Sequence, residues 1–312
     1  MSFFQWLQES FPPAPKWRPE DAPDLTGKVV IVTGGNAGIG REITKGLLKK
    51  NAKVYIATRS EDRAREAIDV LTTETGKKAA FHQLDLSDLA QVRESAQAFA
   101  KRESHIDLLY LNAGVMLPPI DALTKQGYDL TVGISLIGHH LFLRLLYPLL
   151  LAAPAPDPAR IIWVASFAHH HVPGGRLNYA TFTDGPERRK TGLFLLYDEA
   201  KLAQVTLSVY LANRAKERGE RVVSIALHPG NINTEIFRDK KSWLLKLWVR
   251  VYPWPTPYGA ITPLYAGTAP EAVEHKYLRP WARPGSPNLI ALDVTEQDKL
   301  WNWLEEQVKD YL

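Results

Sequence analysis

A tyrosine and a lysine stand four residues apart in the segment Tyr197-Asp-Glu-Ala-Lys201. On a helix this spacing places both side chains on one face, about one turn apart. A free tyrosine has a pKa of about 10, and a nearby ammonium group favours the phenolate and lowers that pKa. Such a pair can donate or accept a proton during a reaction. Because the same spacing also occurs on solvated helix faces, the assignment needs support from elsewhere in the chain.

That support begins with a glycine-rich turn, Thr33-Gly-Gly-Asn-Ala-Gly-Ile-Gly40, which follows an apolar run and precedes a helical pattern. The free N–H groups and the dipole of a helix N-terminus attract phosphate groups. Gly34 permits the turn, Gly38 lets the backbone approach the phosphates, and Gly40 lets the helix pack closely on the strand. The turn therefore predicts a binding site for the pyrophosphate of a dinucleotide.

Short β-rich runs alternate with helical patterns from residue 28 onward. We expect strands at 28–33, 53–58, 79–84, 106–111, 159–165, 221–227 and 276–279, and helices at 38–50, 61–75, 88–102, 124–152 and 195–218. This alternation predicts an α/β fold with a doubly wound, parallel, seven-stranded Rossmann-type sheet. Right-handed crossovers give the strand order 3-2-1-4-5-6-7. A single domain over residues 27–312 would follow an N-terminal extension over residues 1–26.

Polar or glycine-containing segments follow the ends of these strands. They are Thr33, Thr58-Arg59, Asp85, Asn112, Ser166 and His228-Pro-Gly230. Ligands of such sheets bind beyond the carboxyl ends of the strands, so these residues should line one crevice.

Together, the motifs resemble those of the short-chain dehydrogenase/reductase family over residues 25–285. The motifs that carry the resemblance are residues 33–40, Asp85-Leu-Ser87, Asn112-Ala-Gly114, Ser166, Tyr197 with Lys201, and His228-Pro-Gly230 with Thr234. Within the family, the segments 54–59, 138–140 and 165–169 are similar to retinol-dehydrogenase-like reductases, particularly fungal members.

The resemblance implies a role for each site residue. Tyr197 would be the acid–base catalyst, Lys201 would lower its pKa and bind the nicotinamide ribose, and Ser166 would hold the substrate oxygen. A relative usually has Asn at the position of Ser135, where it holds a water in the proton relay behind the lysine. Serine is shorter and has a single donor, so we expect a slower or rearranged relay. The implied cofactor-binding residues are Gly34, Asn36, Gly38, Ile39, Gly40, Arg59, Asp85, Leu86, Asn112, Ala113, Gly114, Tyr197, Lys201, Pro229, Gly230, Ile232 and Thr234.

The residues after the second strand bear on the choice of coenzyme. NAD sites place a carboxylate there, whereas this chain has Thr58 and Arg59. A guanidinium pairs with a 2′-phosphate, which predicts NADP(H), with Asn36 and Arg59 facing that phosphate. The alternative is that Arg59 only begins a solvated helix. Asp85 would accept a hydrogen bond from the adenine, and residues 112–114 would pass close to the adenosine ribose.

Two further segments concern the substrate. Residues 236–257 are rich in Trp, Leu and Tyr and fall where relatives carry a lid, so we expect a substrate lid at about 235–257, with core packing as the alternative. The 31 residues from Ser166 to Tyr197 include an inserted loop beside the substrate. His169-His-His171 alternate sides on an extended segment, which argues against one shared metal ion, and we predict no metal site. One of these histidines would lie near the substrate.

Composition limits the function classes. The 312 residues have a formal net charge of +4, and the basic residues are scattered, which argues against nucleic-acid binding. There is no cysteine and no secretory signal, and we expect a cytoplasmic protein. The apolar stretch 134–153 contains histidine, arginine and proline, which favours a buried helix over a membrane span. The aromatic residues near the N-terminus could dock on the protein, cover the substrate mouth or make weak membrane contact.

These observations predict an NADP(H)-dependent oxidoreductase that moves a hydride between the nicotinamide and a hydrophobic carbonyl or alcohol. Reduction of an aldehyde or ketone is favoured, on a small terpenoid-, steroid-, retinoid- or polyketide-like substrate. The alternative is a weakly catalytic or non-catalytic dinucleotide-binding relative with a sensing or assembly role. The resemblance also implies a homodimer through the helices at 124–152 and 195–218.

Overall fold

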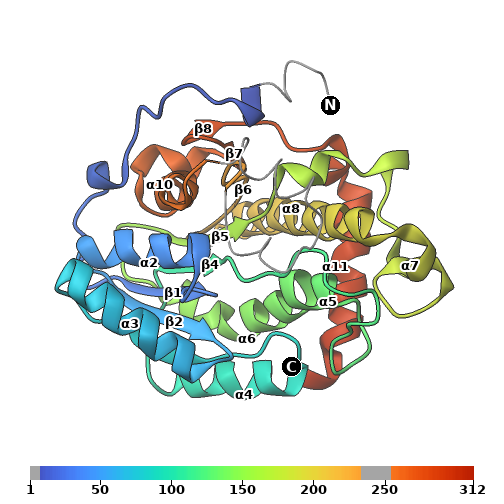
Figure 1. Cartoon of the computed structure of the whole chain (residues 1–312), viewed down its shortest axis with the longest axis horizontal. Helices are drawn as coiled ribbons and strands as arrows, with labels where there is room; N and C mark the ends of the chain where they lie inside the picture. Colours follow the sequence, from blue (N-terminus) through green and yellow to red (C-terminus); the bar gives the residue numbers. More distant parts are fainter. Residues whose placement is uncertain (1–7, 233–253) are drawn as a thin grey trace.

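The fold is seen in a computed structural model that describes residues 8–232 and 254–312 (Figure 1). Its centre is one sheet in the order β3-β2-β1-β4-β5-β6-β7-β8. The strands are β1 (Val29–Thr33), β2 (Lys53–Thr58), β3 (Ala80–Gln83), β4 (Leu108–Leu111), β5 (Ala159–Val164), β6 (Val222–Leu227), β7 (Tyr277–Arg279) and β8 (Arg283–Pro284). The predicted order of the first seven strands is confirmed. The eighth is a two-residue antiparallel addition beside β7 that the sequence pattern did not predict.

Helices cover both faces of the sheet. The helices in the described residues are α2 (Gly38–Lys49), α3 (Glu61–Thr75), α4 (Leu89–Ala100), α5 (Leu130–Val132), α6 (His139–Leu151), α7 (Pro186–Thr191), α8 (Leu193–Glu217), α10 (Ile261–Thr268) and α11 (Val294–Val308), of which α7 stands away from the sheet (Figure 1). Because side chains alternate along a strand, β1 contributes to two cores. Val29 and Ile31 pack with α4, α6 and α8, whereas Val30 and Val32 pack with α2, α3 and α10. The sheet therefore lies between two helical layers.

The helix expected at 124–152 begins later than predicted. Asp129 accepts hydrogen bonds from the backbone N–H groups of Thr131 and Val132, at 2.9 and 3.1 Å, and so caps the helix at Leu130. A π-helical turn over Gly133–Gly138 joins α5 to α6. The helix Leu130–Leu151 is long and apolar enough to cross a membrane, but two thirds of its most apolar window is buried in the protein. This burial is typical of the core helix of a soluble protein.

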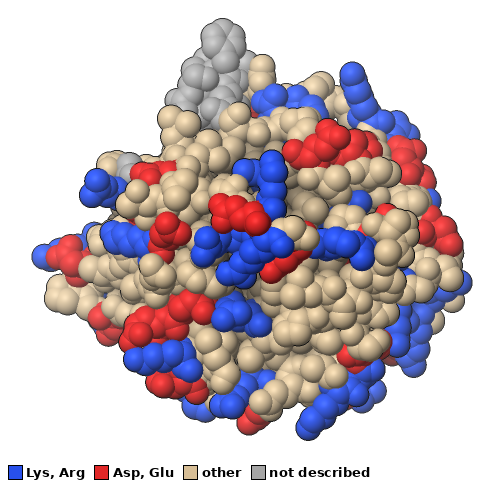
Figure 2. Space-filling view, turned by 180° about the vertical axis from the view of Figure 1, so that it is seen from behind, with Lys and Arg blue, Asp and Glu red and all other residues tan. Residues whose placement is uncertain are grey.

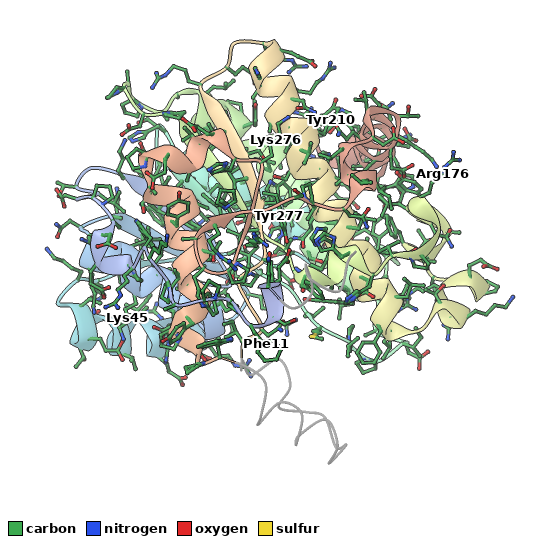
Figure 3. All side chains as sticks on the ribbon, turned by 90° about the horizontal axis from the view of Figure 1, so that it is seen from above. Phe11, Lys45, Arg176, Tyr210, Lys276 and Tyr277 are labelled. Carbon is green, nitrogen blue, oxygen red and sulfur yellow. The ribbon has the colours of Figure 1, made fainter. Side chains whose placement is uncertain are left out.

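The C-terminal helix α11, which the sequence pattern did not predict, lies across α6 and α8 (Figure 1). The ring of Trp301 stacks on that of Tyr210 at 4.7 Å, and Tyr210 lies on the side of α8 that faces α11 (Figure 3). Glu305 accepts hydrogen bonds from His140 and Arg144, each at 2.8 Å. The surface implied for a homodimer is therefore covered, at these residues, by the chain's own C-terminus.

The N-terminal extension docks on the domain beside α10 and β8 (Figure 1). Trp17 packs edge-on against Tyr265, and the backbone oxygen of Gln8 accepts a hydrogen bond from Arg283 at 3.1 Å. The aromatic residues at positions 3, 4 and 6 lie outside the described residues. On the face seen in Figure 2, acidic and basic side chains are interspersed.

Candidate active site

A cavity of about 590 Å³ opens at the carboxyl ends of the central strands. It brings together residues from all the predicted motifs that the structure describes. Its lining includes Gly34, Asn36, Gly38, Ile39, Gly40, Arg59, Asp85, Leu86, Asn112, Ala113, Gly114, Ser166, Tyr197, Lys201, Pro229, Gly230 and Ile232. Ser135 lies behind this wall, next to Gly114, and Thr234 lies outside the described residues.

The glycine turn forms a cradle at one end of the cavity. Gly34 has a φ of +65°, a conformation that favours glycine, and its N–H donates to the carbonyl of Ala57 at 2.8 Å. A Cβ on Gly40 would lie 2.2 Å from the carbonyl oxygen of Gly34 and 2.6 Å from Nδ2 of Asn112. The helix therefore starts against the turn and the Asn112 loop. This leaves the backbone at the N-terminus of α2 open to the cavity, which fits the phosphates of a dinucleotide.

Two arginines line the cavity beyond β2. Arg59 was predicted from the sequence, and Arg63 was not. Arg59 lies in the loop just before the N-cap Ser60, and Arg63 lies in the first turn of α3, so both follow the carboxyl end of β2. Ser60, the N-cap of α3, accepts a hydrogen bond from the backbone N–H of Arg63 at 3.4 Å. The two guanidinium groups give this end of the cavity a positive charge.

Asp85 and Asn112 stand further along the same wall. Oδ1 of Asp85 accepts hydrogen bonds from the backbone N–H of Ser87 at 2.9 Å and from its hydroxyl at 2.6 Å. The side-chain amide of Asn112 donates to the carbonyl of Thr33 at 2.9 Å. Asp85 is thus oriented by the loop that follows β3, and Asn112 by the last residue of β1.

Ser166 and Tyr197 both line the cavity, and their side chains are hydrogen-bonded to each other. Ser166 stands two residues beyond the end of β5, and its hydroxyl accepts a hydrogen bond from the backbone N–H of Ala168 at 3.2 Å. Burial raises the pKa of Tyr197 to about 12, the hydrogen bond with Ser166 lowers it in part, and the charge of Asp198 raises it again. Tyr197 is therefore held as a neutral phenol at physiological pH.

Lys201 stands one turn along α8 from Tyr197, and its Nζ lies 5.6 Å from the centre of the Tyr197 ring. The ammonium donates to the carbonyl of Val164 at 3.1 Å and to Oε1 of Gln204 at 2.8 Å. Burial lowers the pKa of Lys201 to about 7. The prediction that Lys201 brings the pKa of Tyr197 below its usual value is wrong for this structure. Burial penalises the charged forms of both groups, and near neutrality Lys201 carries only part of its charge.

Ser135 takes part in a different way from the one expected. Its hydroxyl donates to the backbone carbonyl of Thr131 within the same helix. Its backbone oxygen accepts a hydrogen bond from Nε2 of Gln204 at 2.7 Å. The expectation of a slower or rearranged relay at Ser135 stays a prediction. The link to Lys201 runs through the Ser135 carbonyl and the side chain of Gln204, which sequence reasoning missed, although it continues the 197, 201, 204 face of α8.

The three adjacent histidines form a 3₁₀ turn, Phe167–His170, and its continuation, not an extended loop. Nδ1 of the fully buried His169 bonds the carbonyl of Ser166 at 2.7 Å. His171 lines the cavity, and its Nδ1 lies 4.0 Å from the carboxylate of Asp198. Within residues 8–232 and 254–312, no group of three or more His, Asp or Glu residues is placed to hold a metal ion.

The substrate side of the cavity is mostly apolar. Its walls include Val115, Met116, Leu117, Ile134, Phe167 and Phe194. Asp198 is a polar exception in this wall, and burial, followed by the charge of Glu199, raises its pKa to about 7.

The insertion between Ser166 and Tyr197 contains α7 and is held by a buried ion pair. Arg188, which is fully buried, donates to Oδ2 of Asp129 at 2.9 Å and to the carbonyl of Ala122 at 3.2 Å. The insertion is thereby tied to the cap of the helix that carries Ser135.

Most of the predicted lid, residues 235–253, lies outside the described residues. The described residues on either side of this segment contact each other. Ile232 forms an isolated parallel β-bridge with Trp254, and the backbone N–H of Trp254 donates to the carbonyl of Asn231 at 2.7 Å. Trp254 packs on Tyr258 and Trp281, so the two ends of this segment meet beside the cavity wall at Ile232.

Comparisons with known proteins agree with this geometry. Residues 28–181 match the short chain dehydrogenase family. A short-chain dehydrogenase/reductase from Armillaria gallica is 46% identical over 98% of this chain and 98% of its own length. Another, from Phomopsis amygdali, is 37% identical over 98% and 97% of the two chains.

Solved structures share the fold. A protein from Mycobacterium paratuberculosis is 26% identical, with a TM-score of 0.73 over 94% of this chain and 97% of its own. The NADP active-site complex of RhlG from Pseudomonas aeruginosa is 24% identical, with a TM-score of 0.63 over 80% and 92% of the two chains.

Proposed function

The chain belongs to the short-chain dehydrogenase/reductase family of oxidoreductases, and from that premise we propose that it reduces a hydrophobic aldehyde or ketone with NADPH. The observation that carries the proposal is the single cavity shared by the glycine cradle, Ser166, Tyr197 and Lys201. A phosphate-binding turn and an acid–base pair in one cavity are what a hydride transfer coupled to a proton transfer requires.

The shape and charge of the cavity suggest which residues would bind each part of the coenzyme. The cradle at Gly34 and Gly40 would hold the pyrophosphate, and Asp85 and Asn112 would face the adenosine half. Arg59 and Arg63 supply positive charge where a 2′-phosphate would lie, which favours NADP(H) over NAD(H). When bound, the reduced nicotinamide supplies the hydride.

The protein supplies the proton and the stabilisation of charge. Negative charge grows on the substrate oxygen during reduction, and the hydroxyls of Ser166 and Tyr197 would donate to that oxygen. Burial raises the pKa of Tyr197, so its hydroxyl carries a proton near neutral pH and can donate it to that oxygen.

The apolar wall of the cavity and the carboxyl group of Asp198 within it indicate what kind of substrate would bind. Phe167 and Phe194 suit a lipophilic body, such as a terpenoid, steroid, retinoid or polyketide skeleton. Asp198 with His171 could bind a hydroxyl or second carbonyl on that body. We expect the protein to act in the cytoplasm.

The test is turnover of a panel of lipophilic aldehydes and ketones with NADPH, compared with a Tyr197→Phe variant. We expect the variant to lose at least 100-fold in kcat while it still binds NADPH, because it lacks only the proton donor. Tyr147→Phe, whose hydroxyl bonds Glu220 away from the cavity, is the matched control and should keep full activity. NADPH binding without turnover of any compound in the wild-type protein would refute the proposal and support the non-catalytic alternative.

A further inference from the structure

A chain of buried polar groups runs from Lys201 to the glycine turn. Gln204, which is fully buried on α8, accepts a hydrogen bond from Nζ of Lys201 at 2.8 Å through Oε1. Its Nε2 donates to the carbonyl of Ser135 at 2.7 Å. One side-chain amide thus spans the gap between the lysine and the π-helical turn of the neighbouring helix.

The chain continues through His139. Its Nδ1 lies 3.1 Å from the carbonyl oxygen of Ser135, and its Nε2 lies 2.9 Å from the hydroxyl of Thr33. Because the carbonyl can only accept, Nδ1 carries the hydrogen and Nε2 is an acceptor for the Thr33 hydroxyl, which also lies within donating distance of the carbonyl of Tyr110 at 3.2 Å. Thr33 in turn accepts from the backbone N–H groups of Asn112 and Ala113, each at 2.9 Å. The loop that lines the cavity is therefore connected to Lys201 by protein groups throughout.

None of these groups is suited to carry a proton near neutral pH. An amide N–H is a hydrogen-bond donor that does not ionise in this range, and a backbone carbonyl only accepts. Burial lowers the pKa of His139 to about 3, so the ring stays neutral. This row of hydrogen-bonded groups can orient Lys201, but it cannot return a proton to Lys201 as a row of water molecules could.

We propose that Gln204 is a positioning residue that stands where relatives hold a relay water, and that it fixes Lys201 by a direct, non-ionising hydrogen-bonded support. The proposal rests on the assignment of Lys201 to the active site. The Tyr197 hydroxyl bond breaks as its proton passes to the substrate oxygen. The resulting phenolate regains a proton from the buffered solvent through the open cavity that Tyr197 lines, because the groups between Lys201 and Thr33 do not ionise near neutral pH.

The titratable groups facing Lys201 in the described part of the chain are Tyr197 on its own helix and His139 on α6. Val164 on β5 and Ser135 offer only carbonyl oxygens. A change at position 204 should therefore act on the titration of Lys201 without interference from a neighbouring carboxylate.

The experiment measures Lys201 directly, by NMR of lysine labelled at Cε and Nζ in the full chain without cofactor. The signal is assigned by its loss in Lys201→Arg. Gln204→Leu removes the acceptor of the ammonium and should lower the titration midpoint by about one pH unit. Gln204→Glu places a carboxylate there and should raise it by at least one unit. A purely structural role would not move the midpoint in opposite directions.

Turnover then tests the replacement of water. Gln204→Ala leaves a polar space that a water can fill, whereas Gln204→Leu fills it with an apolar side chain. We expect Gln204→Ala to be at least fivefold faster than Gln204→Leu, with an unchanged KM for the carbonyl compound. A Leu variant as fast as the Ala variant, or Leu and Glu variants whose midpoints equal that of the wild type or move the same way, would overturn the proposal. If Gln204→Leu does not fold, the midpoint of the Glu variant decides. Because the NMR titration needs no substrate, it stands even if no carbonyl compound is reduced.

Discussion

Replacing Arg59 by alanine should weaken NADPH binding and leave NADH binding nearly unchanged. Arg59 is exposed at the cavity rim, so its interaction with a phosphate is screened by water. Two unit charges about 4 Å apart in water interact by about 1 kcal/mol, and a 2′-phosphate carries up to two negative charges. The expected loss is therefore about 1–2 kcal/mol, which corresponds to a roughly 5- to 30-fold rise in Kd. Arg63→Ala should have a smaller effect in the same direction.

Binding is measured by titrating the protein with NADPH or NADH and following tryptophan fluorescence. Arg65→Ala is the matched control, because Arg65 lies on α3 near Arg59 in the sequence, pairs with Glu61 and does not line the cavity. It should bind both coenzymes as the wild type does. An equal loss for NADPH and NADH in Arg59→Ala, or no loss for either, would refute the assignment of Arg59 to the 2′-phosphate.

Three further predictions concern stability, pH and assembly. Arg188→Ala leaves the buried carboxylate of Asp129 without its partner and should lower the free energy of unfolding in urea by about 3–5 kcal/mol; a loss below about 1 kcal/mol would contradict this role. The pKa of Lys201 is lowered to about 7, so its ammonium is present below that pH, and kcat/KM for reduction should fall as pH rises from 6 to 8; a flat profile would contradict it. Because α11 covers α6 and α8, light scattering should give the monomer mass of 35.1 kDa, and a dimer mass would show that another surface associates.

Much of the fold could be predicted because its signals are local. Most of the first seven strands are short apolar runs, and the order of parallel strands follows from the handedness of the crossovers. Because the carboxyl ends of parallel strands meet at one edge of the sheet, Ser166, Asp85 and Asn112 could also be predicted to lie there. The spacing of Tyr197 and Lys201 predicted their shared helix face directly.

Other features depended on partners far away in the chain. The helix begins at Leu130 because Asp129 caps it, and the carboxylate of Asp129 is held in that position by an ion pair with Arg188, which is 59 residues away in the sequence. The helix α11 has few local signals, and its position depends on rings and charges presented by α6 and α8. Gln204 reads as an ordinary helical residue until Lys201 and the Ser135 carbonyl are placed on either side of it.

The order of the first seven strands could thus be determined from the amino-acid sequence alone, and the proposed reacting groups were predicted from it, because periodicity and motif spacing act over a few residues. The protonation states of Tyr197 and Lys201 and the support behind the lysine were decided only by the tertiary structure. The physical reason is that burial and hydrogen bonding depend on which groups surround a side chain, and those groups come from β5, α6 and α8 at once.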